Sequence, residues 1–120
     1  MLLDSGAVRV EDTALVGARN LDPPEEAFIA ASGLGVGEEA ILRALAGTDG
    51  VYVAFDLDVL DPSEAAVFMP EPDGLRLADA ERILGSIADR SHVAGVGLTG
   101  HLLDPRNTEP LVRICRALGL

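Results

Sequence analysis

The order of hydrophobic and polar positions predicts a chain in which strands and helices alternate. Near-continuous apolar runs over 13–18, 51–56 and 93–98 are typical of strands buried on both faces. Apolar residues at helical spacing, together with proline and glycine signals, predict helices over 25–31, 37–46, 77–89 and 107–118. The stretch 61–74 between them has no period and is rich in turn residues, so we expect a long loop there.

Particular residues define the expected helix faces and ends. The helix over 77–89 should bury one stripe of side chains, namely Leu77, Ala80, Ile83, Leu84 and Ile87. The helix over 37–46 should place Ile41, Leu42 and Leu45 on one face. The segment Asn107-Thr108-Glu109-Pro110 is typical of a helix start, with a polar cap and an early proline.

This alternation predicts the α/β class: a three-layer arrangement in which helices cover both faces of a parallel sheet. With 120 residues, 48% of them hydrophobic, the chain has the size of one domain and can bury a core. Only three or four strands are visible, fewer than such sheets usually have. We therefore expect a part of a larger sheet.

Composition narrows the partners and the compartment. The formal net charge of -11 and the 3% aromatic content argue against nucleic acid and against anionic membrane surfaces. No apolar run reaches membrane-spanning length, and the first residues lack the pattern of a signal peptide. Cys115 is the single cysteine, which excludes an internal disulfide framework. We expect a cytoplasmic protein.

The candidate chemistry lies where the strand over 51–56 ends, at Asp56, Asp58 and Asp61. Period-two geometry should point Asp56 and Asp58 the same way, at the sheet edge where α/β proteins bind ligands. Two such carboxylates repel each other unless a cation lies between them. An EF-hand calcium loop is excluded, because it needs a ligand at Leu60 and an acid at Val67.

Two metal-dependent families have a comparable Asp-x-Asp after a hydrophobic strand. Haloacid dehalogenase phosphatases also require a threonine two residues after the second aspartate and a downstream lysine. Leu60 stands at the first place, and the chain contains no lysine. A phosphatase of the haloacid dehalogenase type is therefore only an alternative interpretation.

The second resemblance, to the ureohydrolases (arginases, agmatinases and formiminoglutamases), is more extensive. The segment 55–62, Phe-Asp-Leu-Asp-Val-Leu-Asp-Pro, resembles the family signature Ser-Phe-Asp-x-Asp-x-x-Asp-Pro, with Ala54 in place of the serine. The segment 17–25 resembles Gly-x-Arg-Asp-x-Asp-Pro-x-Glu, with Asn20 in place of an aspartate, and 70–75 resembles a loop that ends in Gly-Gly-Leu. The resemblance implies that residues 1–120 are the C-terminal part of a ureohydrolase-like domain with a partial arginase-like fold.

The resemblance also implies roles for single residues. Asp56 would bridge two Mn²⁺ ions and Asp58 would bind one of them, so that activated water attacks a guanidinium carbon and urea and an amine leave. Asp22 and Glu25 correspond to residues that contact the far end of the substrate, although acids at a helix start also occur for purely structural reasons. Asp61 should form a turn or support the ligands, and His101 is a further possible site residue.

Departures from the family pattern shape the functional expectation. Two motifs that supply the other metal ligands, Gly-Gly-Asp-His and Asp-Ala-His-x-Asp, do not occur in these 120 residues, and Thr99 or Gly100 stands where the family has a guanidinium-pairing glutamate. We expect a chain that is inactive alone and belongs to a hydrolase of linear amidines or guanidino compounds. The alternative is a degenerate, non-enzymatic paralogue or association module. In either case an open sheet edge should favour homo-oligomers.

Overall fold

The computed structural model describes residue 3 and residues 5–120, which fall into two compact units. The first unit extends to Thr48 and the second runs from Asp49 to Leu120. Each unit is built on a pair of parallel strands accompanied by helices. The α/β class and the parallel pairing expected from the sequence are confirmed.

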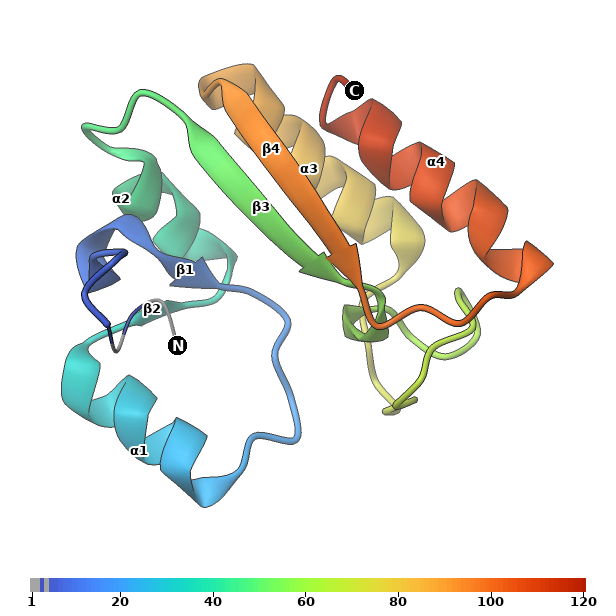
Figure 1. The fold of residues 1–120 in the computed structure, drawn as a ribbon, viewed down its shortest axis with the longest axis horizontal. Helices are drawn as coiled ribbons and strands as arrows, with labels where there is room; N and C mark the ends of the chain where they lie inside the picture. Colours follow the sequence, from blue (N-terminus) through green and yellow to red (C-terminus); the bar gives the residue numbers. More distant parts are fainter. Residues whose placement is uncertain (1–2, 4) are drawn as a thin grey trace. The chain divides into compact units, whose positions relative to one another are not determined.

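The second unit contains the longer pair of strands and the longest helix, α3 (Figure 1). Its elements are β3 (Val51–Asp56), η3 (Leu57–Val59), α3 (Leu77–Arg90), β4 (Val93–Thr99), η4 (Pro105–Asn107) and α4 (Thr108–Ala117). In the parallel register Ala54 lies beside Gly97 and Asp56 beside Thr99, so both strands end at the same edge. The expected strands over 51–56 and 93–98 and the helices over 77–89 and 107–118 are confirmed within one or two residues.

Helix α3 lies across one face of the β3–β4 pair, with α4 beside it (Figure 1). The expected stripe of α3 is buried at all five positions: Leu77, Ala80, Ile83, Leu84 and Ile87. Arg113 of α4 forms an ion pair with Glu81 of α3 and a weaker one with Glu109. On the opposite face of β3, Tyr52 is 65% exposed and its ring covers Gly95 and Gly97, where any added Cβ would meet that ring. Close packing therefore explains these two glycines, as expected.

The turn after β3 is anchored in the core. Leu57 and Leu60 are completely buried, as is Ile114 of α4. Burying a leucine or isoleucine side chain stabilises a fold by about 1.5–3 kcal/mol. Asp58 lies between the two leucines, so the backbone that carries it has little freedom.

The first unit is smaller and only partly as expected. It contains η1 (Val10–Asp12), β1 (Ala14–Leu15), α1 (Pro23–Ser32), β2 (Gly35–Val36), η2 (Glu38–Ala40) and α2 (Ile41–Leu45). The strand expected over 13–18 is reduced to two residues, and its partner β2 was not predicted. Helix α1 begins two residues earlier than expected and ends at Gly33, whose φ of 72° suits glycine.

Two expectations about helix residues were wrong. The single helix expected over 37–46 is instead the 3-10 turn η2 followed by the short α2. Leu42 does not lie on its inner face: it is 56% exposed, and the buried positions are Ala40 and Ala44. The close approach of this segment to Gly35, where an added Cβ would lie 2.7 Å from that of Ala40, explains why small side chains face inward. Asn107 precedes α4, but its side chain makes no capping hydrogen bond.

Among the described residues, no helix is both long and apolar enough to cross a membrane.

Candidate metal centre

Asp56 and Asp58 lie together at the C-terminal end of β3. The Asp56 side chain is exposed, and its Oδ1 accepts a hydrogen bond from the backbone N–H of Asp58 at 3.1 Å. Asp58 is half-buried within the short 3-10 turn η3. The two residues are therefore linked by a local hydrogen bond.

The geometric reason given for this pair from the sequence was wrong. Strand pairing stops at Asp56, and Asp58 belongs to a 3-10 turn, so period-two alternation does not set the direction of its side chain. The turn forms because the Asp56 carboxylate accepts the Asp58 N–H while Leu57 and Leu60 are drawn into the core. A turn, and not strand alternation, sets the position of Asp58 relative to Asp56.

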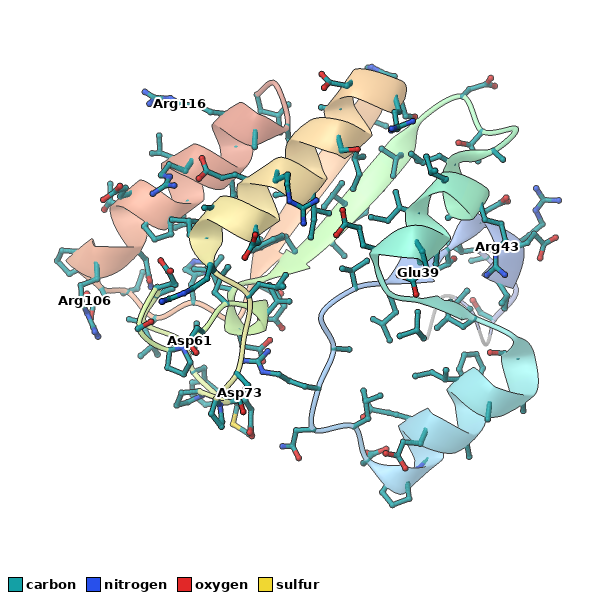
Figure 2. The ribbon with its side chains drawn as sticks, turned by 180° about the vertical axis from the view of Figure 1, so that it is seen from behind. Glu39, Arg43, Asp61, Asp73, Arg106 and Arg116 are labelled. Carbon is teal, nitrogen blue, oxygen red and sulfur yellow. The ribbon has the colours of Figure 1, made fainter. Side chains whose placement is uncertain are left out.

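Asp61 stabilises the start of the loop over 61–74. Its Oδ1 accepts hydrogen bonds from the N–H of Ser63 at 3.0 Å and from the Ser63 hydroxyl at 2.7 Å. Its backbone N–H donates to Leu75 O at 2.8 Å, which closes the base of the loop. Gly74 makes that closure possible, since an added Cβ would lie 2.6 Å from Leu60 O. Figure 2 shows Asp61 and Asp73 in this loop region beyond β3.

Gly100, directly after β4, lies against the Asp56 carboxylate. A Cβ built on Gly100 would overlap Oδ1 of Asp56 and lie 2.8 Å from its Cγ. Gly100 also has a φ of 73°, a conformation that favours glycine. His101, a possible site residue, is exposed, and its backbone pairs in antiparallel fashion with Val67.

The sequence did not reveal the role of Asn107. Only 1% of this residue is exposed, and its amide joins the loop after β3 to the loop after β4. Oδ1 accepts from Ala66 N, and Nδ2 donates to Ala66 O and Leu102 O, each at 2.8 Å. A local signal could have suggested this role. Asp104-Pro105 is itself a cap signature, and the Asp104 side chain accepts the Arg106 N–H at 2.8 Å, which leaves Asn107 for long-range contacts.

The Asp104 carboxylate has a shifted pKa. Hydrogen bonds from the Arg106 guanidinium, followed by the one from its backbone N–H, hold the pKa of Asp104 below its ordinary value. Correspondingly, this carboxylate raises the pKa of Arg106. The pair lies at the start of η4, which leads into α4, and Figure 2 labels Arg106.

Asp22 and Glu25, the candidate substrate residues, lie in the first unit and form a reciprocal capping box at the start of α1. Glu25 N donates to Asp22 Oδ1, and Asp22 N donates to Glu25 Oε2, both at 2.9 Å. Both side chains are exposed. They have a structural function, which leaves their relation to a substrate a prediction.

The carboxylate oxygens of Asp56 and Asp58 are suitable ligands for Mn²⁺, but two residues are too few for a complete metal site. Carboxylate oxygens are ligands that Mn²⁺ prefers. Within the part of the chain that the structure describes, however, no group of three or more His, Cys, Asp or Glu side chains is placed to hold a metal ion. Among the described residues, Asp56 and Asp58 are therefore two candidate ligands and do not form a complete binuclear site.

Comparison with known proteins identifies the family. Residues 2–99 match the model of the Arginase family. The arginase of Bacillus caldovelox is 29% identical over 127 residues, covering 92% of this chain and 42% of that arginase. The arginase of Brevibacillus brevis is 32% identical over 97 residues, covering 68% and 33% respectively. The crystal structure of arginase from Bacillus cereus superposes with a TM-score of 0.83 at 28% identity, covering 92% of this chain and 45% of that one.

The chain thus spans less than half the length of these relatives. The match favours the ureohydrolase resemblance over the phosphatase alternative, because it covers the Asp-x-Asp segment and most of its surroundings. The architecture, the aspartate pair at the strand end and the family match agree, and the chain belongs to the arginase family.

Proposed function

We propose that this chain carries part of the site of a metal-dependent hydrolase that acts on linear amidines or guanidino compounds, with Asp56 and Asp58 as Mn²⁺ ligands. The observation that carries the proposal is the hydrogen bond that links the Asp58 N–H to the Asp56 carboxylate at the C-terminal end of β3, in a chain of the arginase family. Small molecules bind at this edge of open α/β sheets.

The two aspartates would contribute position and charge. When bound, a pair of Mn²⁺ ions supplies a nucleophile from water at neutral pH. Asp56 is held between the Asp58 N–H and Gly100, while Asp58 is fixed by the buried residues on either side. The net charge of -11 favours approach of metal cations and of a cationic guanidinium group.

Two carboxylates do not complete a binuclear site, so the proposal includes a source for the other ligands. The histidine motifs of the family do not occur in these 120 residues. The remaining ligands would have to come from residues other than these, and we expect no hydrolysis by the chain alone. Asp22 and Glu25 are proposed to contact the far end of the substrate, Asp61 to support the ligand turn, and His101 to lie near the site.

The coding sequence before the Met1 codon provides the first test. In-frame Gly-Gly-Asp-His and Asp-Ala-His-x-Asp motifs would support the proposal, and an in-frame stop without them would favour the non-enzymatic alternative.

The second test is an activity assay on the longer polypeptide that includes the residues encoded upstream of Met1. This polypeptide should release urea from arginine or agmatine in the presence of Mn²⁺. Asp56→Ala should abolish release. Asp89→Asn is the matched control, because Asp89 is an exposed acid in the last turn of α3. Equal activity of both variants would contradict a role for Asp56.

Association is the second candidate function. Four large apolar side chains on the loops beyond β3 and β4 are exposed: Phe68 (73%), Met69 (59%), Leu102 (42%) and Leu103 (102%). Exposed apolar clusters of this kind often mark contact surfaces. The expected homo-oligomer would be seen as a mass above 12.5 kDa in light scattering after size exclusion, and a monomeric mass would refute it.

The single Cys115 supports the further proposal of a reducing, cytoplasmic location.

A further inference from the structure

A chain of contacts leads from the buried Asn107 side chain to the Asp56 carboxylate. We propose that Asn107 is a positioning residue for Asp56 and acts through the backbone of Gly100. The proposal rests on the proposed function, in which Asp56 is a metal ligand, and it names the residue that fixes this ligand in place.

The first link is the amide of Asn107, which uses both its oxygen and its nitrogen. It accepts from Ala66 N and donates to Ala66 O, so it pairs with this residue as a neighbouring strand would. The same nitrogen donates to Leu102 O. No other uncharged side chain of this size offers an acceptor and two donors in one plane. Asn107 therefore holds the two loops at a fixed separation.

The second link is the pairing of these loops with each other. Leu102 N donates to Ala66 O at 3.1 Å, and Phe68 N donates to Gly100 O at 3.0 Å. Between these bonds, Val67 and His101 form an antiparallel bridge. Since Asn107 bonds one residue in each loop, the position of the Gly100 backbone depends on it.

The third link is the contact of Gly100 with Asp56. The carboxylate lies where a side chain on residue 100 would begin, and the Asp58 N–H holds its Oδ1. A shift of the Gly100 backbone would open space beside the carboxylate. The Asp56 side chain could then rotate and leave the Asp58 N–H.

Asn107→Asp tests this chain of contacts in the metal-free protein. The variant keeps the size and the acceptor for Ala66 N–H, but it replaces the donor to two carbonyl oxygens with an acceptor. The readout is the NMR shift of the Asp58 amide proton, which reports its hydrogen bond to Asp56. It should move upfield in Asn107→Asp, and the apparent Mn²⁺ affinity, measured by electron paramagnetic resonance, should fall at least about tenfold.

Two further variants keep the test decisive. Gly100→Ala should move the same Asp58 signal while Asn107 is intact, which covers the case that Asn107→Asp does not fold. Ala88→Gly lowers helix stability near the C-terminal end of α3, at the opposite end of the helix from the loop that precedes it, and should leave the signal unchanged. An unchanged Asp58 signal in Asn107→Asp, or an equal movement in Ala88→Gly, would overturn the positioning role.

The two readouts also separate this inference from the proposed function. Movement of the Asp58 signal in Asn107→Asp without any Mn²⁺ binding to the parent chain would support the positioning contact and contradict an independent metal site in this chain. Mn²⁺ binding that depends on Asp56 but is equally tight in Asn107→Asp would support the metal site and contradict the positioning role.

Discussion

Replacing Gly100 with alanine should destabilise the second unit more than its backbone conformation alone requires. The φ of 73° costs an L-residue about 1–2 kcal/mol. The new Cβ would also overlap Oδ1 of Asp56, which must then move and lose its hydrogen bond with the Asp58 N–H, a loss of about 1 kcal/mol. The expected total is about 2–3 kcal/mol.

Gly119→Ala isolates the backbone contribution. Gly119 has a φ of 78° in the same unit, but a Cβ there would meet no atom within 4 Å. Urea unfolding followed by circular dichroism should give a loss of about 1–2 kcal/mol for this variant, about 1 kcal/mol less than for Gly100→Ala. Equal losses for the two variants would refute the conclusion that the Asp56 carboxylate occupies the space beside Gly100.

Three other changes have expected outcomes. Ile114→Ala should lower the free energy of unfolding by about 2–5 kcal/mol in urea titrations, because Ile114 is completely buried; a loss below 1 kcal/mol would contradict its place in the core. Asp104→Asn should make the free energy of unfolding fall less steeply as the pH is lowered. Arg106 lowers the folded-state pKa of Asp104, so this carboxylate stabilises the fold above its unfolded pKa and loses that effect as pH falls through the folded pKa; unchanged acid unfolding would refute this. Asp22→Ala should weaken α1 by about 1 kcal/mol through loss of the capping bond to Glu25, seen as faster amide exchange in α1, and unchanged exchange would speak against the cap.

The periodic parts of the fold could be predicted from the sequence because local pattern and burial agree there. The stripe in α3 runs from Leu77 to Ile87, about three turns, and β3 is apolar until the residue at which pairing ends. Strand β2 has only two residues, one of them glycine, and carries no period that could be read. Leu42 was misplaced because the close approach to Gly35 decides the inner face of its helix, and that approach is a tertiary contact.

The candidate site residues could be selected from the sequence, but their geometry could not. Asp56 and Asp58 stand out in the chain, but a hydrogen-bonded turn brings them together, where strand alternation was expected. The partner of Asn107 is Ala66, 41 residues away, and no local pattern could identify that partner. Its neighbour Asp104, which takes over capping at the same helix start, is the nearest sequence signal.

Site-resolved Mn²⁺ binding by the 120-residue chain tests the central claim most directly. At low Mn²⁺, paramagnetic broadening in the NMR spectrum should affect the amides of 56–59 and 100–101 first, should disappear in Asp56→Ala and should persist in Asp89→Asn. Resolution by residue matters because a net charge of -11 also attracts cations without a site. Broadening that spreads over all exposed acids, and that Asp56→Ala leaves unchanged, would contradict a metal-binding role for the aspartates at the end of β3.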